Sequence, residues 1–342
     1  MVWIKARASY NRAARAPNVF ELFRNGDQGF PSYTDPCNST VSNRDDAFCI
    51  AQGVPAGAID TFQQVNSQVQ SFSFGNPNLS EEKAETWTAG IVITPDSILG
   101  ANVTLTADYY NIEVTNRVAG LGTGFFLSDC YTNRNPDSCA RISRNSATGQ
   151  IDFINTTVGN SSTPLTTSGV DFGLDVRFPA LGGEIYLSDV LTWVDEYKVG
   201  ASDFVDTVFS GIGGVTPEWK NALTAGWRDE SFTAQVRYVW AKGGRQNFPG
   251  ADLDGLYPYD PVTGDPYYDE YPDRIPDLNL LSASLRWRAT ENFELTTIVN
   301  NLLDKYPPQT TTGVFEQANT NISFYDGYAL GRTWTVQARI KF

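Results

Sequence analysis

The last ten residues of the chain, TWTVQARIKF (333–342), alternate apolar and polar side chains without a break. Apolar side chains stand at the even-numbered positions, Trp334, Val336, Ala338, Ile340 and Phe342. The odd-numbered positions carry threonine, glutamine and basic side chains. Because successive side chains of a β-strand point to opposite faces, this pattern predicts a strand with one apolar and one polar surface.

The same alternation recurs in nine further segments of the chain. They are 2–10, 87–93, 103–109, 170–178, 184–195, 219–228, 232–240, 281–287 and 293–299. With their flanks they give strands of about ten to fourteen residues, longer than ordinary globular strands and long enough to cross a bilayer at a tilt. Aromatic residues stand at many segment ends, which is typical of interfacial girdles. We therefore predict an all-β fold, an antiparallel transmembrane β-barrel, with a soluble β-sandwich as the alternative.

One segment departs from this pattern. Within 184–195, Asp189 falls on the same face of the predicted strand as the apolar Leu187 and Leu191. A β-bulge or a position at the end of the apolar band would explain it, and the sequence leaves both open.

Short and long connections alternate strictly between the ten segments. The short ones are 94–100, 179–183, 229–230 and 289–292, and the long ones are 11–82, 115–166, 197–217, 243–276 and 304–329. Membrane barrels of bacteria have short periplasmic turns and long external loops. The long connections are therefore predicted to lie outside the cell, and the last strand to end at Phe342 in the periplasm.

The four cysteines fall in two of the long connections. Cys37 lies near Cys49, and Cys130 lies near Cys139, each in a polar segment. Their spacing lacks the CxxC pattern of zinc sites. Two disulfides, each local to its loop, are favoured over free thiols and imply an oxidising compartment.

Composition excludes several classes of function. Asp and Glu exceed Lys and Arg by 39 to 25, giving a net charge of −14, whereas a nucleic-acid-binding protein needs a basic face. Histidine is absent, which removes every triad, general base or metal site built on an imidazole. Serine–lysine or paired-carboxylate chemistry stays open, but we predict neither an enzyme nor a cofactor. No apolar run suits a transmembrane helix, and the N-terminus lacks the pattern of a secretory signal.

Five segments resemble, in order, motifs of TonB-dependent outer-membrane receptors. They are ASYNRAARAPNVFELF (8–23), NPNLSEEKAET (76–86), ADYYNI (107–112), NNLLDKY (300–306), and GRTW with the closing ARIKF (331–342). The resemblance implies that 1–342 is the C-terminal part of the barrel, about the last ten strands of a barrel with about 22 strands and a plugged lumen. The plug, the energy-coupling box and the earlier strands would lie outside this sequence.

The resemblance also implies a function and partners. The parent protein would bind a siderophore, carbohydrate or similar nutrient outside the cell. The TonB–ExbB–ExbD complex would then drive its import through the plug. The chain would lie in the outer membrane of a Gram-negative bacterium, in contact with lipid, and Phe342 would be the signal read by the barrel assembly machinery. A passive, self-closed porin-like channel of ten strands is the alternative.

Three regions of the sequence are candidates for contact with the ligand. The acidic, tyrosine-rich stretch 251–274 leans towards a carbohydrate or peptide-like ligand, because aromatic faces stack on sugars and carboxylates hold hydroxyls; a solvated loop is the alternative. Its candidate residues are Tyr257, Tyr259, Tyr267, Tyr268, Asp265 and Asp269, with Asp252 and Asp254 as a weak Ca²⁺ candidate. Arg12, Arg15 and Arg24 could hold an anionic ligand or form ion pairs. Phe125 and Phe126 could touch a ligand or anchor a loop.

Overall fold

The computed structural model describes residues 3–207, 216–245, 274–308 and 324–342. The chain divides into two compact units. The first comprises 1–12, 85–113 and 165–342, and the second comprises 13–84 and 114–164. Each unit has its own β-sheet.

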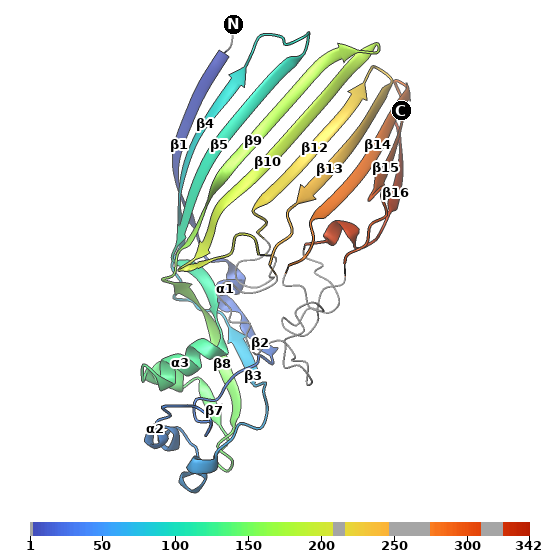
Figure 1. Cartoon of the computed structure of the whole chain (residues 1–342). Helices are drawn as coiled ribbons and strands as arrows, with labels where there is room; N and C mark the ends of the chain where they lie inside the picture. Colours follow the sequence, from blue (N-terminus) through green and yellow to red (C-terminus); the bar gives the residue numbers. More distant parts are fainter. Residues whose placement is uncertain (1–2, 208–215, 246–273, 309–323) are drawn as a thin grey trace, which may run out of the picture. The chain divides into compact units, whose positions relative to one another are not determined.

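The first unit is built on one large sheet (Figure 1). Its path of hydrogen-bonded strands is β1 (Trp3–Arg15), β4 (Glu82–Thr94), β5 (Asn102–Thr115), β9 (Leu165–Ala180), β10 (Gly183–Val199), β12 (Trp219–Arg228), β13 (Phe232–Ala241), β14 (Leu278–Thr290), β15 (Phe293–Asn300) and β16 (Thr333–Ile340). The short β11 (Ser202–Asp203) pairs with β10, and η2 (Asp326–Tyr328) is a short 3₁₀ helix. From β9 to β16 each strand is antiparallel to the next. The ten strands predicted from alternation are therefore confirmed.

The short connections are tight turns with local causes. The turn between β9 and β10 places Leu181 and Gly182 at positive φ, 55° and 74°, as a two-residue hairpin with the right twist requires. Between β12 and β13, the side chain of Asp229 accepts hydrogen bonds from the backbone N–H groups of Ser231 and Phe232. These turns fix the register of the hairpins on either side.

The strand register gives the sheet one apolar and one polar face, as predicted. On the apolar face, Ile185 lies between Phe178 and Trp227 in one row. In another row the rings of Trp193 and Trp219 stack with centroids 6.1 Å apart. Val336 is 66% exposed on this face. Because soluble proteins rarely expose so large an apolar surface, the face is suited to lipid.

The path of strands ends at β1 on one side and β16 on the other. Within the described residues these two strands do not pair with each other, so the sheet is open. A self-closed channel would need that pairing. The barrel size of 22 strands stays a prediction.

Both explanations offered for Asp189 are wrong. The register of β10 on β9 is unbroken from Gly183 to Val194, and the irregularity lies between Val194 and Glu196. Asp189 pairs with Leu174 on one side and Leu223 on the other, in the middle of the strand. A carboxyl group therefore stands in the middle of the apolar face.

The second unit is a small sheet with short helices. Its strands follow the path β2 (Asn25–Gly29), β3 (Gln70–Phe74), β8 (Ile151–Ser161) and β6 (Arg117–Leu121), with β7 (Ile142–Arg144) also on β8. Its helices are α1 (Val19–Phe23), α2 (Asp46–Ala51), η1 (Ala56–Thr61), α3 (Thr123–Tyr131) and α4 (Pro136–Cys139). β3 and β8 are parallel, which brings together segments far apart in the chain. Among the helices of the described residues, none is long and apolar enough to cross a membrane.

Candidate functional site

The polar face of the large sheet is hollowed across β9 to β15. The groove has a volume of about 490 Å³. Its charged and aromatic lining consists of Asp175, Arg177, Tyr186, Arg228 and Arg286, with serine, threonine and glutamine between them. Each of these side chains comes from the polar parity of its strand, so strand alternation alone gathers them on one surface.

Three arginines and the carboxylate of Asp175 line this groove. Arg228 is balanced by Glu184, whose Oε1 accepts from Nε at 2.9 Å and from Nη2 at 2.6 Å. Arg286 donates from Nη2 to the neutral hydroxyl of Thr233 at 3.0 Å. Asp175 and the paired Glu184 stand against the three arginines, so the groove and its partners carry an excess of one positive charge in a chain whose net charge is −14.

Tyr186 lies across the groove because its neighbour on β12 has no side chain. A Cβ atom on Gly226 would stand 2.5 Å from the Tyr186 hydroxyl oxygen. The hydroxyl donates to Oε1 of Gln235 at 2.8 Å, and the Arg228 guanidinium lies 5.6 Å from the ring centroid. The tyrosine therefore spans three strands and holds two other lining residues in place.

A second hollow of about 380 Å³ adjoins the first and shares Gln235 and Ser284 with it. Arg237 and Asn300 add polar groups there, while Leu280 adds an apolar one. Guanidinium, amide and hydroxyl groups of this kind bind anionic and polar ligands through hydrogen bonds. Within the part of the chain that the structure describes, no cluster of three or more metal-ligating side chains occurs.

The acidic, tyrosine-rich stretch falls outside the described residues. This applies to every residue predicted in it: Asp252, Asp254, Tyr257, Tyr259, Asp265, Tyr267, Tyr268 and Asp269. Its role in ligand or Ca²⁺ binding stays a prediction.

Arg12 and Arg15 are not brought together. They lie three residues apart on β1 and so project from opposite faces of the strand. Arg12 pairs with Glu85 at 3.1 Å, next to the aromatic pair Tyr10–Trp87, whose ring centroids are 4.3 Å apart. An ion pair next to an aromatic pair is typical of residues that anchor a barrel at the interface between membrane and water.

Arg15 is the centre of an ionic clip in the second unit. Its Nη1 and Nη2 atoms each donate to Glu21 at 3.0 Å, and its Nε donates to Glu82 at 2.5 Å. Hydrogen bonds from Arg15, and then from the backbone of Asn18, hold the pKa of Glu21 below its usual value. Glu82 also accepts from the backbone N–H of Val118 at 2.7 Å. The clip joins residues of the two motifs 8–23 and 76–86.

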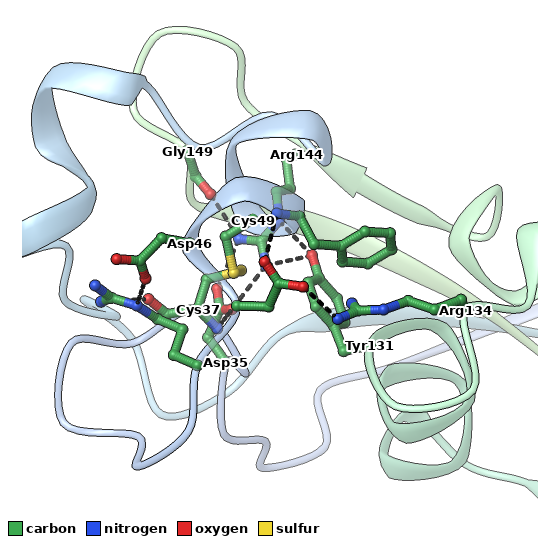
Figure 2. The surroundings of a disulfide bond; sticks show 11 residues. Asp35, Cys37, Asp46, Cys49, Tyr131, Arg134, Arg144 and Gly149 are labelled. Atoms are coloured by element: carbon green, nitrogen blue, oxygen red, sulfur yellow. Dashed lines mark hydrogen bonds and ion pairs between the residues drawn. A yellow bond between two sulfur atoms is a disulfide. The ribbon is translucent and has the colours of Figure 1, made fainter.

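The two predicted disulfides are confirmed, as Cys37–Cys49 and Cys130–Cys139. Figure 2 shows Arg144 and Asp35 beside the first of them. Arg144 donates to both carboxylate oxygens of Asp35 at 2.7 Å and to the hydroxyl of Tyr131 at 2.8 and 3.1 Å. Burial raises the pKa of Tyr131, and the nearby Arg144 opposes this rise. This network was not predicted, because nothing local in the sequence links its members.

The remaining candidates take structural positions. Phe126 is buried against β8 in the second unit, while Phe125 is half exposed with its ring edge-on to that of Phe126. Arg24 lies over the ring of Phe20 at 4.1 Å and faces Asp27 at 3.5 Å. Phe342, two residues beyond the end of β16, is fully exposed.

Known proteins resemble the whole chain. The family profile described as "TonB dependent receptor-like, beta-barrel" matches residues 3–302. The ferric enterobactin receptor of Pseudomonas aeruginosa superposes with a TM-score of 0.57 and 17% identity, covering 99% of this chain and 38% of that one. A siderophore receptor of Acinetobacter baumannii, PirA, does so with a TM-score of 0.55 and 12% identity, covering 99% and 39%. A sequence comparison with curated proteins finds no match.

These matches agree with the open, two-faced sheet. The chain spans about two fifths of the length of the receptor structures it matches. At this level of identity the structures establish the fold, and the family profile, which covers most of the residues, establishes the family. The chain therefore belongs to the TonB-dependent receptor family and contributes strands to its β-barrel.

Proposed function

We propose that this chain forms part of the wall of an active outer-membrane importer. The observation that carries the proposal is the two-faced sheet, apolar on one face and lined by Arg177, Arg228 and Arg286 on the other. An apolar exterior around a polar interior is the arrangement of a transport barrel. Membership of the TonB-dependent receptor family supports the same function and an outer-membrane location in a Gram-negative bacterium.

Within this proposal the ligand carries negative charge. The arginines of the groove supply forked donors that suit carboxylates, phenolates or phosphates. The siderophore-receptor neighbours share only the fold, but a ferric chelate is consistent with this charge. A carbohydrate is the second candidate, favoured by the tyrosines and carboxylates of the stretch 251–274.

Import is proposed to be driven by the TonB–ExbB–ExbD complex acting on the plug. The test expresses the parent protein in cells and measures uptake and binding of ferric chelates and of oligosaccharides. Uptake of a ferric chelate that stops when TonB is deleted, while binding persists, is the expected result. Uptake that continues without TonB would instead identify a passive channel.

The triple variant Arg177→Gln, Arg228→Gln and Arg286→Gln tests the groove. We expect at least a tenfold loss of chelate uptake with normal assembly in the membrane. Lys220→Gln, which removes a basic residue of the polar face outside the groove, is the control and leaves uptake unchanged. Binding and uptake of oligosaccharides alone, unaffected by the triple variant, would replace the anionic ligand with a carbohydrate.

A further inference from the structure

A third hollow of the polar face lies at the turn between β14 and β15, beside the end of β16. Its volume is about 150 Å³, and it is formed by strands that are neighbours in the sheet (Figure 1). The turn belongs to the short connection 289–292, so the predicted orientation places the hollow at the periplasmic end of the wall. We call it the rim hollow, and its charged lining consists of Arg286, Arg288, Glu291, Glu294, Arg339 and Lys341.

Positive charge exceeds negative charge in the rim hollow, with four basic side chains against two acidic ones. The register places Glu294 in one row between Arg288 and Arg339, so a single carboxylate faces two guanidinium groups. It lies 3.8 Å from Nε of Arg288, which is too far for a hydrogen bond. Among the described residues, neither Arg339 nor Lys341 has an ion-pair or hydrogen-bond partner for its side chain. Their donors are therefore available to a ligand.

The rim hollow continues the groove of the proposed ligand site. Arg286 lines both of them, and Ser284, two residues before it on β14, lines the groove and the second hollow. Arg237, in the second hollow, pairs with Ser282 on the same strand. Residues two apart on a strand are separated by roughly 7 Å, so these positions follow one another along the wall towards Arg288. Basic side chains thus lead from the second hollow to the periplasmic turn.

The size of the rim hollow limits what it can hold. Pockets that enclose a whole small molecule measure about 300–1,000 Å³. At about 150 Å³, the rim hollow suits one anionic group of a larger ligand. Guanidinium and ammonium groups bind the oxygens of carboxylates, phenolates and phosphates through charge-assisted hydrogen bonds.

We propose that the rim hollow is a second anion-binding subsite, which holds one negatively charged group of the ligand at the periplasmic end of the wall. The ligand reaches it from the groove through Arg286, and Arg339 and Lys341 hold the anionic group. That this anion is an imported ligand rests on the proposed function, whereas the existence of the subsite does not. An acidic side chain of the plug is a different occupant, and the test separates the two.

A single cysteine in the rim hollow tests the subsite in the purified parent protein. Asn292→Cys places a thiol in the lining, and the four native cysteines are paired in disulfides, so the added thiol reports alone. Its reaction rate is measured with the anion sulfonatoethyl methanethiosulfonate and with the cation trimethylammonioethyl methanethiosulfonate. Relative to their rates with free cysteine, we expect the anion to react about tenfold faster than the cation. Inorganic pyrophosphate should protect the thiol from the uncharged methyl reagent.

Charge variants in the same background identify the residues of the subsite. Arg339→Gln with Lys341→Gln should remove both the preference for the anion and the protection by pyrophosphate. Because these residues lie near the end of the chain, Arg288→Gln on β14 is a second variant and should weaken both effects. Heat-modifiable migration shows that each variant is folded.

The matched control removes the same charge elsewhere on the polar face. It combines Lys5→Gln with Lys220→Gln and should change neither effect. A row of apolar side chains separates Lys220 from Arg237, and it consists of Val190, Ala222, Val239 and Leu280. Equal rates for the two charged reagents, no protection by pyrophosphate, or unchanged effects in the variant of Arg339 and Lys341 would each overturn the proposal. A thiol that no reagent reaches in the folded protein would show that the plug fills the hollow and would also overturn it.

The part of the subsite in import is measured separately, with the ferric complexes of citrate and of catechol as probes. Arg339→Gln with Lys341→Gln should slow uptake several-fold while binding at the cell surface stays unchanged. Unchanged uptake in this variant would overturn the role in import. If the unchanged protein imports neither complex, the proposed function fails for these anions, and the labelling result still decides the subsite.

Discussion

Arg144 and Asp35 form a buried, bidentate ion pair between segments far apart in the sequence. The Nη1 and Nη2 atoms of Arg144 each lie 2.7 Å from a carboxylate oxygen of Asp35, and the side chains are 3% and 0% exposed. Arg144 also donates to the carbonyl of Gly149 and to the hydroxyl of Tyr131. The pair ties the Cys37–Cys49 segment to the β7 segment within the second unit.

Removing one partner should destabilise the second unit strongly. Asp35→Asn leaves the guanidinium buried without a counter-charge, and such a change typically costs about 3–5 kcal/mol. Hydrogen exchange of the amides in β7 and β8, followed by mass spectrometry, measures the loss. The control Lys83→Gln breaks the exposed pair with Glu81 and should leave protection almost unchanged, because solvent screens an exposed ion pair. Equal effects of the two variants would show that the buried pair is not the tie.

The buried tyrosine beside this pair should make the unit sensitive to alkali. Burial raises the pKa of Tyr131 in the folded state above its ordinary value of 10.0, with Arg144 opposing. Its contribution to stability is therefore complete below pH of about 10 and falls as pH rises further, because the unfolded chain loses its proton first. Protease sensitivity of the loops between pH 9 and 11 is expected to rise less steeply in Tyr131→Phe than in the unchanged protein. The same steepness in both would assign the alkaline transition to another group.

The two disulfides should differ in their access to reductant. Both cysteines of the Cys37–Cys49 disulfide are buried, with 0% and 1% of their surface exposed. Cys139 of the second disulfide is partly exposed. Thiol–disulfide exchange requires access of a thiolate to a sulfur atom. Mild reduction of the folded protein followed by alkylation should therefore label Cys130 and Cys139 first. Prior labelling of Cys37 would indicate that the second unit opens under native conditions.

Features that rest on local sequence patterns could be predicted from the sequence, whereas features that rest on contacts between distant segments could not. The strands of the large sheet were predictable because lipid on one face and polar groups on the other impose a strict period of two. The second unit was not, because the parallel pairing of Gln70–Phe74 with Ile151–Ser161 and the Arg144–Asp35 pair depend on long-range contacts. The hydrogen bond from Asn221 to Asp189 lies between these cases. Both residues have the apolar parity of their strands, but only the register shows that they are neighbours.

The ionic clip of Arg15 gives a test that separates a structural role from ligand binding. Arg15→Gln removes bonds to Glu21 and Glu82, and Glu82 in turn holds the backbone of Val118. Because Arg15 is partly exposed, we expect a modest loss, about 1 kcal/mol, seen as faster hydrogen exchange near Val118. Arg12→Gln, which breaks the separate pair with Glu85, is the matched control and should leave that amide unchanged. If Arg15 instead serves the ligand, as the sequence pattern also allows, Arg15→Gln would weaken ligand binding with no change in exchange at Val118.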